Sequence, residues 1–119
     1  MLLRIDASST EPLFAQIAAS IRADVARGAL KVGERLPPAR TVAEELDVNL
    51  HTVLHAYQEL RDEGLVDMRP GRGAVISAHA GELGELHVKV ASLVAEARAR
   101  GVADEVLVSL VRVAQREAQ

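Results

Sequence analysis

The sequence has no cysteine and no tryptophan, and it has only one phenylalanine and one tyrosine among its 119 residues. Without cysteine, the protein can form neither a disulfide framework nor a zinc site with thiolate ligands. With so few aromatic side chains, its core must be built from Leu, Val, Ile and Ala, which is typical of helices packed through short apolar stripes. The length allows one small domain, or one domain with an appendage.

Long apolar runs are also missing from the sequence. No segment approaches the roughly 18 apolar residues that indicate a membrane-spanning helix. The N-terminus lacks the charged, apolar and small-residue regions of a signal peptide. We therefore expect a cytoplasmic protein that makes no contact with a membrane.

An excess of positive charge is absent as well. The chain has 14 Lys and Arg residues against 17 Asp and Glu residues, and residues 1–78 hold nine basic and eleven acidic side chains. Proteins that bind nucleic acid normally carry a basic excess, because neutralising phosphates releases counterions and supplies much of the affinity. If this chain binds DNA, it must concentrate its positive charge on one face, and dimerisation would double that face.

A short amphipathic helix is predicted over residues 49–63. Its apolar residues recur at helical spacing and form one stripe: Val53, Ala56, Tyr57 and Leu60. The opposite side carries polar side chains: His51, His55 and Gln58. Asn49 is a good N-cap for this helix, and Gly64 is the expected residue at its C-terminal end. One face of the helix should therefore be buried, and the other should present hydrogen-bonding groups.

The segments before this helix predict two further helices. Apolar residues repeat at every fourth position from Leu13 to Val25, which predicts a scaffold helix. A second, short helix is predicted over residues 39–46, and only residues 47–49 connect it to the next one. A connection of three or four residues between two short helices is the spacing of a helix-turn-helix.

The segment after the helix predicts a β-hairpin. Residues 65–69 and 74–77 alternate like strands on either side of a turn, Pro70-Gly71-Arg72-Gly73. Residues 1–5 are apolar enough to add a short edge strand. The order of elements predicts a mainly α fold with a small β-hairpin wing, which is a winged helix-turn-helix domain over residues 1–78.

Residues 79–119 are expected to form two dimerisation helices. Residues 79–84 are small or glycine-rich and mark the predicted boundary. The apolar positions of the two helices form a face too broad for one small domain to cover: Leu86, Val90, Leu93, Val94, Val106, Leu107, Leu110 and Val111. Such a surface is most simply covered by a second copy of the chain, in a two-fold symmetric dimer.

Specific sequence runs resemble a known family. The runs are Pro12-Leu13-Phe14-Ala15-Gln16-Ile17, Gly28 to Pro37, Val42-Ala43-Glu44-Glu45-Leu46, Ala56-Tyr57, Glu63-Gly64-Leu65-Val66 and Gly71-Arg72-Gly73. In order and spacing they resemble the winged helix regulators of the GntR family. With a tail of about 40 residues, the chain is similar to the YtrA subfamily. The resemblance implies a DNA-binding dimer, joined through the tail helices, that represses a neighbouring transporter operon. The two-fold symmetry of such a dimer predicts that its operator is an inverted repeat of double-stranded DNA.

The resemblance also implies which residues contact DNA. They are Arg35, Arg40, Asn49, His51, Thr52, Gly71, Arg72 and Gly73. The outward position of His55 on the predicted helix and the position of Arg69 near the tip of the predicted hairpin add these two residues to the expected DNA contacts. Two positions depart from the family, because many members have arginines where this chain has Leu50 and Leu54. These leucines cannot bind guanine edges as arginines do. Leu54 lies beside the outward face, where we expect it to contact a thymine methyl group.

Three other functions compete with DNA binding. His51 and His55 are spaced to share a metal ion, but a metal there would obstruct the expected DNA face, so no metal or cofactor is expected. No nucleophile with its base, P-loop or dinucleotide-binding turn is present, so no enzymatic activity is expected. The remaining alternative is a winged helix that binds protein instead of DNA. The sequence does not identify a small-molecule effector.

Overall fold

The computed structural model describes residues 3–119, and the fold is mainly α with one β-hairpin, as predicted. The elements in chain order are α1 (Leu13–Ala26), α2 (Ala39–Leu46), α3 (Leu50–Asp62), β1 (Val66–Arg69), β2 (Gly73–Ile76), α4 (Ala80–Ala99) and α5 (Asp104–Glu117). The chain divides into two compact units, Met1–Glu85 and Leu86–Gln119. Of the edge strand expected over residues 1–5, the first two residues lie outside the described range. Leu3 and Ile5 pack against the core without forming a strand.

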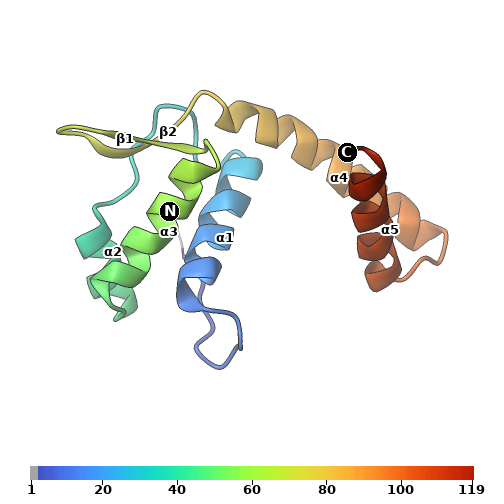
Figure 1. The fold of residues 1–119 in the computed structure, drawn as a ribbon, viewed down its shortest axis with the longest axis horizontal. Helices are drawn as coiled ribbons and strands as arrows, with labels where there is room; N and C mark the ends of the chain where they lie inside the picture. Colours follow the sequence, from blue (N-terminus) through green and yellow to red (C-terminus); the bar gives the residue numbers. More distant parts are fainter. Residues whose placement is uncertain (1–2) are drawn as a thin grey trace. The chain divides into compact units, whose positions relative to one another are not determined.

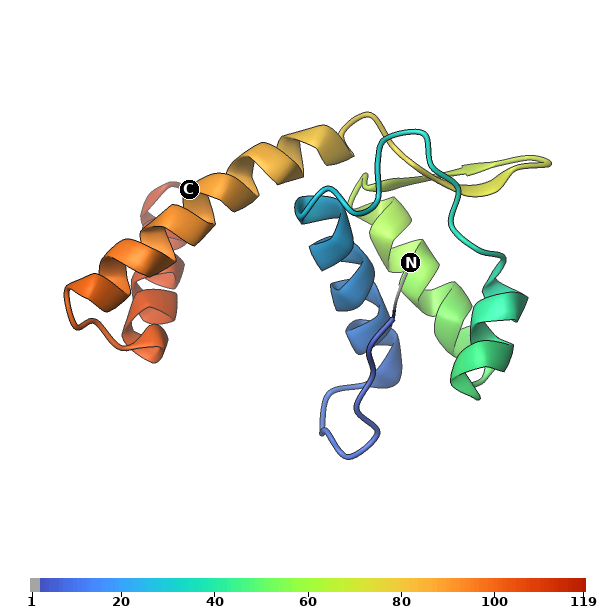
Figure 2. The same ribbon diagram turned by 180° about the vertical axis from the view of Figure 1, so that it is seen from behind.

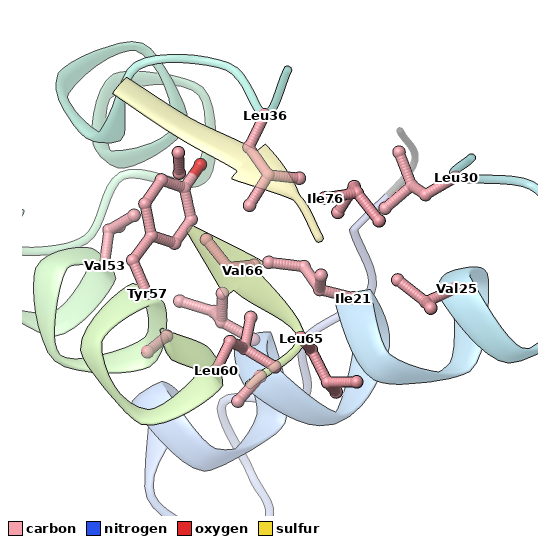
Figure 3. Close-up of a cluster of buried hydrophobic side chains, with 14 of the residues drawn as sticks. Ile21, Val25, Leu30, Leu36, Val53, Tyr57, Leu60, Leu65, Val66 and Ile76 are labelled. Atoms are coloured by element: carbon pink, nitrogen blue, oxygen red, sulfur yellow. The ribbon is translucent and has the colours of Figure 1, made fainter. Parts of the chain in front are cut away.

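The first unit is a winged helix-turn-helix. Helices α1 and α3 lie side by side, α2 packs against α3, and the hairpin begins just beyond the end of α3 (Figure 1, Figure 2). Its core is aliphatic and draws on α1, α3 and both strands, with Ile21, Leu60, Val66 and Ile76 almost completely buried (Figure 3). The predicted stripe of α3 is buried, whereas His51, His55 and Gln58 are exposed. The helical spacing of the apolar residues therefore predicted correctly which face of α3 is buried.

A third extended segment pairs with the outer edge of the hairpin. β1 and β2 are antiparallel, with Val66 opposite Ile76 and Arg69 opposite Gly73. On the other side of β2, the Leu36 amide donates to the Ala74 carbonyl oxygen at 2.8 Å, and the Ile76 amide donates to the Glu34 carbonyl oxygen at 2.8 Å. These bonds fix Arg35 directly beside β2. The sequence did not predict this pairing, because residues 29–35 show no strand-like alternation.

Hydrogen bonds and backbone conformation fix the turn between α2 and α3 and the start of α3. Asp47, between α2 and α3, has φ 54° and is the one non-glycine residue of the described range with positive φ. The Val48 amide closes the turn by donating to the Ala43 carbonyl oxygen at 3.0 Å. At the start of α3, the Asn49 side chain accepts from the His51 amide at 2.8 Å, which confirms the predicted N-cap.

We expect Gly64→Ala to destabilise the protein by about 1–2 kcal/mol, because Gly64 ends α3 with φ 82°. An added Cβ would lie 3.5 Å from Cδ2 of His79, an ordinary contact, so the cost is conformational. Urea unfolding at one protein concentration measures this change. Gly81→Ala is the matched control: it lies in α4, its Cβ would meet nothing within 4 Å, and it should not destabilise. Equal stability of the two variants would contradict the left-handed requirement at Gly64.

The division into two units falls within α4. The domain boundary predicted after residue 78 lies just before α4, whereas the first compact unit extends to Glu85. The reason is that Ala80 is buried and Leu83 packs against the core of the first unit. The first turn of α4 thus completes the winged helix domain. None of the helices within residues 3–119 is both long and apolar enough to span a membrane.

The second unit leaves most of its apolar side chains exposed. Arg98 joins the end of α4 to the start of α5 by donating to both carboxylate oxygens of Asp104, at 3.1 and 3.0 Å. This contact lowers the pKa of Asp104. No residue of α5 is buried. Of the residues predicted for dimerisation, Val94 and Leu107 are half-buried and the other six are exposed.

Candidate DNA-binding surface

Four of the ten predicted DNA contacts lie on α3 or at its N-cap. Asn49 and His51 are exposed at the N-terminal end of the helix, and Thr52 is half-buried beside them. Because the Asn49 side-chain oxygen already accepts from the His51 amide, its NH₂ group is the part left for an external partner. The end of α3 nearest α2 therefore presents one imidazole, one hydroxyl and one amide donor.

His55 has a different environment from His51. Its ring stacks on Phe14 of α1, with ring centroids 3.8 Å apart and planes 17° apart. One face of the imidazole is therefore covered by α1, although the residue as a whole is exposed. His55 consequently supports the α1–α3 packing, and its predicted DNA contact is limited to its open edge. No sequence pattern indicates this pair, because the two residues lie far apart in the chain.

The arginines of the first unit fall into two groups. Four of them form ion pairs within the unit: Arg22 with Glu63, Arg27 with Asp24, Arg61 with Asp62 and Arg69 with Asp67. Among the predicted DNA contacts, Arg35, Arg40 and Arg72 are exposed and form no ion pair within residues 3–119. Positive charge is thus available on α2, on the segment paired with β2 and on the hairpin turn, despite the negative total.

Arg69 and Arg72 differ although both belong to the hairpin. Arg69 lies at the end of β1, and its guanidinium is 3.5 Å from the Asp67 carboxylate. Arg72 follows Pro70-Gly71, where the Arg72 amide donates to the Arg69 carbonyl oxygen at 3.0 Å and Gly71 has φ 76°. A Pro-Gly pair with positive φ at the glycine is the signature of a type II turn. The turn leaves the Arg72 side chain without an acidic partner among the described residues.

A cavity of about 210 Å³ lies between the hairpin, α3 and the start of α2. We call it the wing cavity; it is lined by Arg35, Leu36, Pro37, Pro38, Ala39, Leu54, Tyr57, Met68, Arg72, Gly73 and Ala74. Leu54 is half-buried and contributes to its wall. The wing cavity therefore brings Arg35 and Arg72 beside an outward residue of α3, although the three are far apart in the sequence.

Tyr57 connects α3 to the segment before α2 through a hydrogen bond. Its ring lies in the core between the side chains of Val53 and Leu36 (Figure 3), and its hydroxyl donates to the Pro37 carbonyl oxygen at 2.7 Å. Burial raises the pKa of the hydroxyl well above its ordinary value of 10.0. The sequence indicated Tyr57 as a core residue only, and its second role is to position Pro37 and Pro38 next to α3.

The single tyrosine allows this environment to be measured. We expect the Tyr57 hydroxyl to stay protonated above pH 10 in the folded protein, whereas it ionises near pH 10 in the unfolded chain. Stability should therefore be unaffected by Tyr57 below pH 10 and should fall as pH rises from there toward the folded pKa. Tyrosinate absorbance against pH measures the ionisation, and Tyr57→Phe should lose this part of the alkaline destabilisation. Ionisation near pH 10 in the folded state would contradict the buried contact.

Metal ligands do not gather in the described part of the chain. No group of three His, Asp or Glu side chains within residues 3–119 is placed to hold a metal ion. His51 and His55 share the outward side of α3, but His55 is stacked on Phe14. The outward face of α3 therefore offers no assembled metal site, and its exposed groups are hydrogen-bonding side chains.

Comparisons with known proteins agree with the fold and with the position of the helix-turn-helix. The family described as "Bacterial regulatory proteins, gntR family" matches residues 13–76. The HTH-type transcriptional repressor YtrA of Bacillus subtilis is 35% identical over 79 residues, which cover 66% of this chain and 61% of that protein. The uncharacterized HTH-type transcriptional regulator YhcF of the same organism is 34% identical over 88 residues, covering 74% of this chain and 73% of that protein.

A solved structure extends the similarity over nearly the whole chain. YtrA from Sulfolobus acidocaldarius, a GntR-family transcription factor, has 30% sequence identity and a TM-score of 0.61, covering 98% of this chain and 100% of that one. A transcriptional regulator from Oenococcus oeni, with 24% identity and a TM-score of 0.61, has the same fold. The family match spans more than half of the chain, from α1 through β2. The chain therefore belongs to the gntR family of bacterial regulatory proteins, within which it resembles the YtrA proteins.

Proposed function

We propose that this chain is a cytoplasmic transcriptional repressor that binds a specific sequence of double-stranded DNA as a homodimer. One observation carries the proposal: three exposed arginines of the helix-turn-helix unit have no acidic partner in the described residues, namely Arg40 on α2 and the two that line the wing cavity with Leu54 of α3, Arg35 and Arg72. A helix that reads bases needs such cations beside it, because phosphate contacts fix its position and supply much of its affinity.

In the proposed complex, α3 lies in the major groove of DNA. The N-terminal residues of a recognition helix contact the base edges, which assigns base contacts to Asn49, His51 and Thr52. Arg40, on the exposed side of α2, contacts phosphate, as do Arg35 beside β2 and Arg72 in the hairpin turn. The hairpin lies over the adjacent backbone or minor groove.

The second unit supplies the dimer contacts in this proposal. Helix α5 has no buried residue, and Val106, Leu110 and Val111 are 51, 56 and 42% exposed. Apolar surface of this extent is unfavourable in water and is covered when two copies associate. A two-fold dimer binds an inverted repeat, with half-sites about one helical turn apart, roughly 34–36 Å, if it is arranged like simpler helix-turn-helix dimers.

The similar proteins support the sign of the regulation. The YtrA protein of Bacillus subtilis is named a transcriptional repressor. By analogy, we propose that this chain lowers transcription when bound, and that a transporter operon near its own gene is the target. A repressor of this kind acts by occupying its operator, so no catalytic group is required.

Selection of binding sequences from random duplex DNA tests the proposal. The purified dimer should enrich an inverted repeat, and its affinity for that repeat should fall steeply with salt, because each neutralised phosphate contributes about 0.9 to the slope of log K against log salt. An enriched repeat would support the repressor and identify the operator. If no sequence is enriched by a folded dimer, DNA binding fails as the function, and the alternative of a winged helix that binds protein is favoured.

A further inference from the structure

The wing cavity has a composition that does not follow from DNA binding alone. Most of its wall is apolar, formed by Leu36, Pro37, Pro38, Ala39, Leu54, Met68 and Ala74 together with the ring of Tyr57. Its two charged side chains are both arginines, and no acidic residue lines it. A phosphate backbone is polar and needs no apolar chamber beneath it, so the apolar wall calls for a separate explanation.

The charges at the wing cavity are available to a ligand. Neither Arg35 nor Arg72 forms an ion pair within the described residues. Helix α2 begins at the cavity wall with no side-chain cap, since Pro38 occupies the N-cap position. An uncapped helix start adds partial positive charge from its free amides. Three separate elements therefore contribute positive potential around one apolar space.

A second groove, along α1, provides a useful contrast. It is larger, about 680 Å³, and it contains Arg4 and Arg27. However, Glu11 and Asp24 line the same groove, and Arg27 is already bonded to Asp24 at 2.7 Å. Its charges are balanced within the protein, so it has no preference for an anion. The wing cavity alone of these two combines apolar walls with uncompensated positive charge.

We propose that the wing cavity binds a small monocarboxylate with a compact apolar body, such as a single ring or a short branched chain. The apolar body would lie against Leu54, Met68 and Ala39, and the carboxylate would accept hydrogen bonds from both Arg35 and Arg72. The volume of about 210 Å³ is below the roughly 300–1,000 Å³ of pockets for drug-sized ligands, which limits the ligand to a small acid. Charge-assisted bonds to arginine provide the selection for carboxylate over neutral groups.

The regulatory consequence rests on the proposed function. The carboxylate and the DNA backbone would use the same arginines, so binding of one excludes the other. By linkage, a ligand present at ten times its dissociation constant would weaken operator binding by about 11-fold per competing site. The acid would thus act as an inducer directly at the DNA-binding surface, without a separate effector domain or a change of conformation.

Methionine labelling provides a direct test on the DNA-free protein. Met68 lines the wing cavity, and the other methionine is the first residue, so methyl-¹³C methionine gives one internal reporter. Sodium benzoate is the probe, and sodium chloride of equal ionic strength, sodium acetate and benzamide are the controls. We expect benzoate to shift the Met68 signal saturably, and acetate and benzamide to bind at least tenfold more weakly. A Met68 signal that does not respond to benzoate, or that responds equally to acetate, would overturn the proposal.

Two variants locate the binding site. Ala39→Leu fills the cavity and leaves both arginines in place, and Arg72→Gln removes one charge on an exposed turn. Each should weaken benzoate binding at least tenfold, and Ala39→Leu should still bind the operator with an affinity that benzoate no longer reduces. Benzoate competition that persists in Ala39→Leu would place the acid elsewhere and overturn the proposal.

The two proposals fail in distinguishable ways. If benzoate shifts Met68 but no DNA sequence is bound, the wing cavity stands as a ligand site and the regulatory function fails. If the operator is bound but benzoate leaves Met68 unchanged, the function stands and the ligand site fails. If both bind without competition, the cavity site stands and its role as an inducer site is overturned.

Discussion

Replacing Leu110 with aspartate is expected to convert the proposed dimer into monomers and to weaken operator binding by about 10²–10⁴-fold, the range by which a second linked site raises affinity. Leu110 is 56% exposed on α5, a helix with no buried residue. A carboxylate there would have to be desolvated against the apolar surface of the partner, which is strongly unfavourable without a counter-charge. Sedimentation velocity measures the assembly, and titration of labelled operator measures the affinity.

Arg112→Asp is the matched control for this prediction. It makes the same exposed helix more negative, but at about 100° per residue it lies roughly 100° or more around the helix axis from Val106, Leu107, Leu110 and Val111. It should remain dimeric and bind DNA as the parent protein does. Because the first unit has its own core, Leu110→Asp should keep a folded winged helix domain. If Leu110→Asp stays dimeric and binds the operator with full affinity, α5 does not form the dimer interface.

The sequence predicted the parts of the fold that depend on local periodicity. The stripe of Val53, Ala56, Tyr57 and Leu60 repeats at helical spacing, and all four side chains are buried. Asn49 and Gly64 marked the two ends of α3 correctly, because capping depends on side-chain chemistry and backbone freedom at single positions. The hairpin was predicted correctly too, because the backbone preferences of Pro70 and Gly71 mark a turn at single positions.

Contacts between distant segments were not predictable in this way. The bonds between residues 33–36 and β2 use backbone groups, which every residue carries, so no side-chain pattern reveals them. The stacking of His55 on Phe14 and the ion pair of Arg22 with Glu63 depend on the packing of α3 against α1. These tertiary contacts decide which arginines are free. The candidate surface was therefore identified by sequence, but its electrostatics and the wing cavity required the structure.

The free arginines should carry a large share of the DNA affinity. Arg40→Ala and Arg72→Ala are each expected to weaken operator binding roughly 10²- to 10⁴-fold, since a hydrogen bond to a charged group is worth about 1.5–3 kcal/mol and a dimer loses two. The slope of log K against log salt should fall by about 0.9 for each phosphate that the variant no longer neutralises, and so by about 1.8 for the dimer. Fluorescence anisotropy at several salt concentrations measures both quantities.

Arg116→Ala is the charge-matched control. Arg116 lies on α5, is exposed and forms no ion pair within the described range, so its removal deletes the same charge without touching the first unit. Its affinity and salt slope should change little, because exposed charges are screened beyond about 8–10 Å at physiological salt. If Arg40→Ala and Arg72→Ala behave like Arg116→Ala, the free arginines do not face phosphate and a protein-binding winged helix becomes the better explanation.

Measuring the affinity of each variant for the operator and for random DNA distinguishes residues that contact phosphate from residues that contact bases. A phosphate contact strengthens binding to all sequences alike, so Arg40→Ala should reduce affinity for the operator and for random DNA by the same factor. His51 lies at the exposed N-terminal end of α3, to which the proposed complex assigns the base contacts, so His51→Ala should reduce the ratio of the two affinities instead. Because His55 is stacked on Phe14, His55→Ala should change that ratio less than His51→Ala does. A larger loss of specificity in His55→Ala would mean that its open edge, rather than His51, reads the operator.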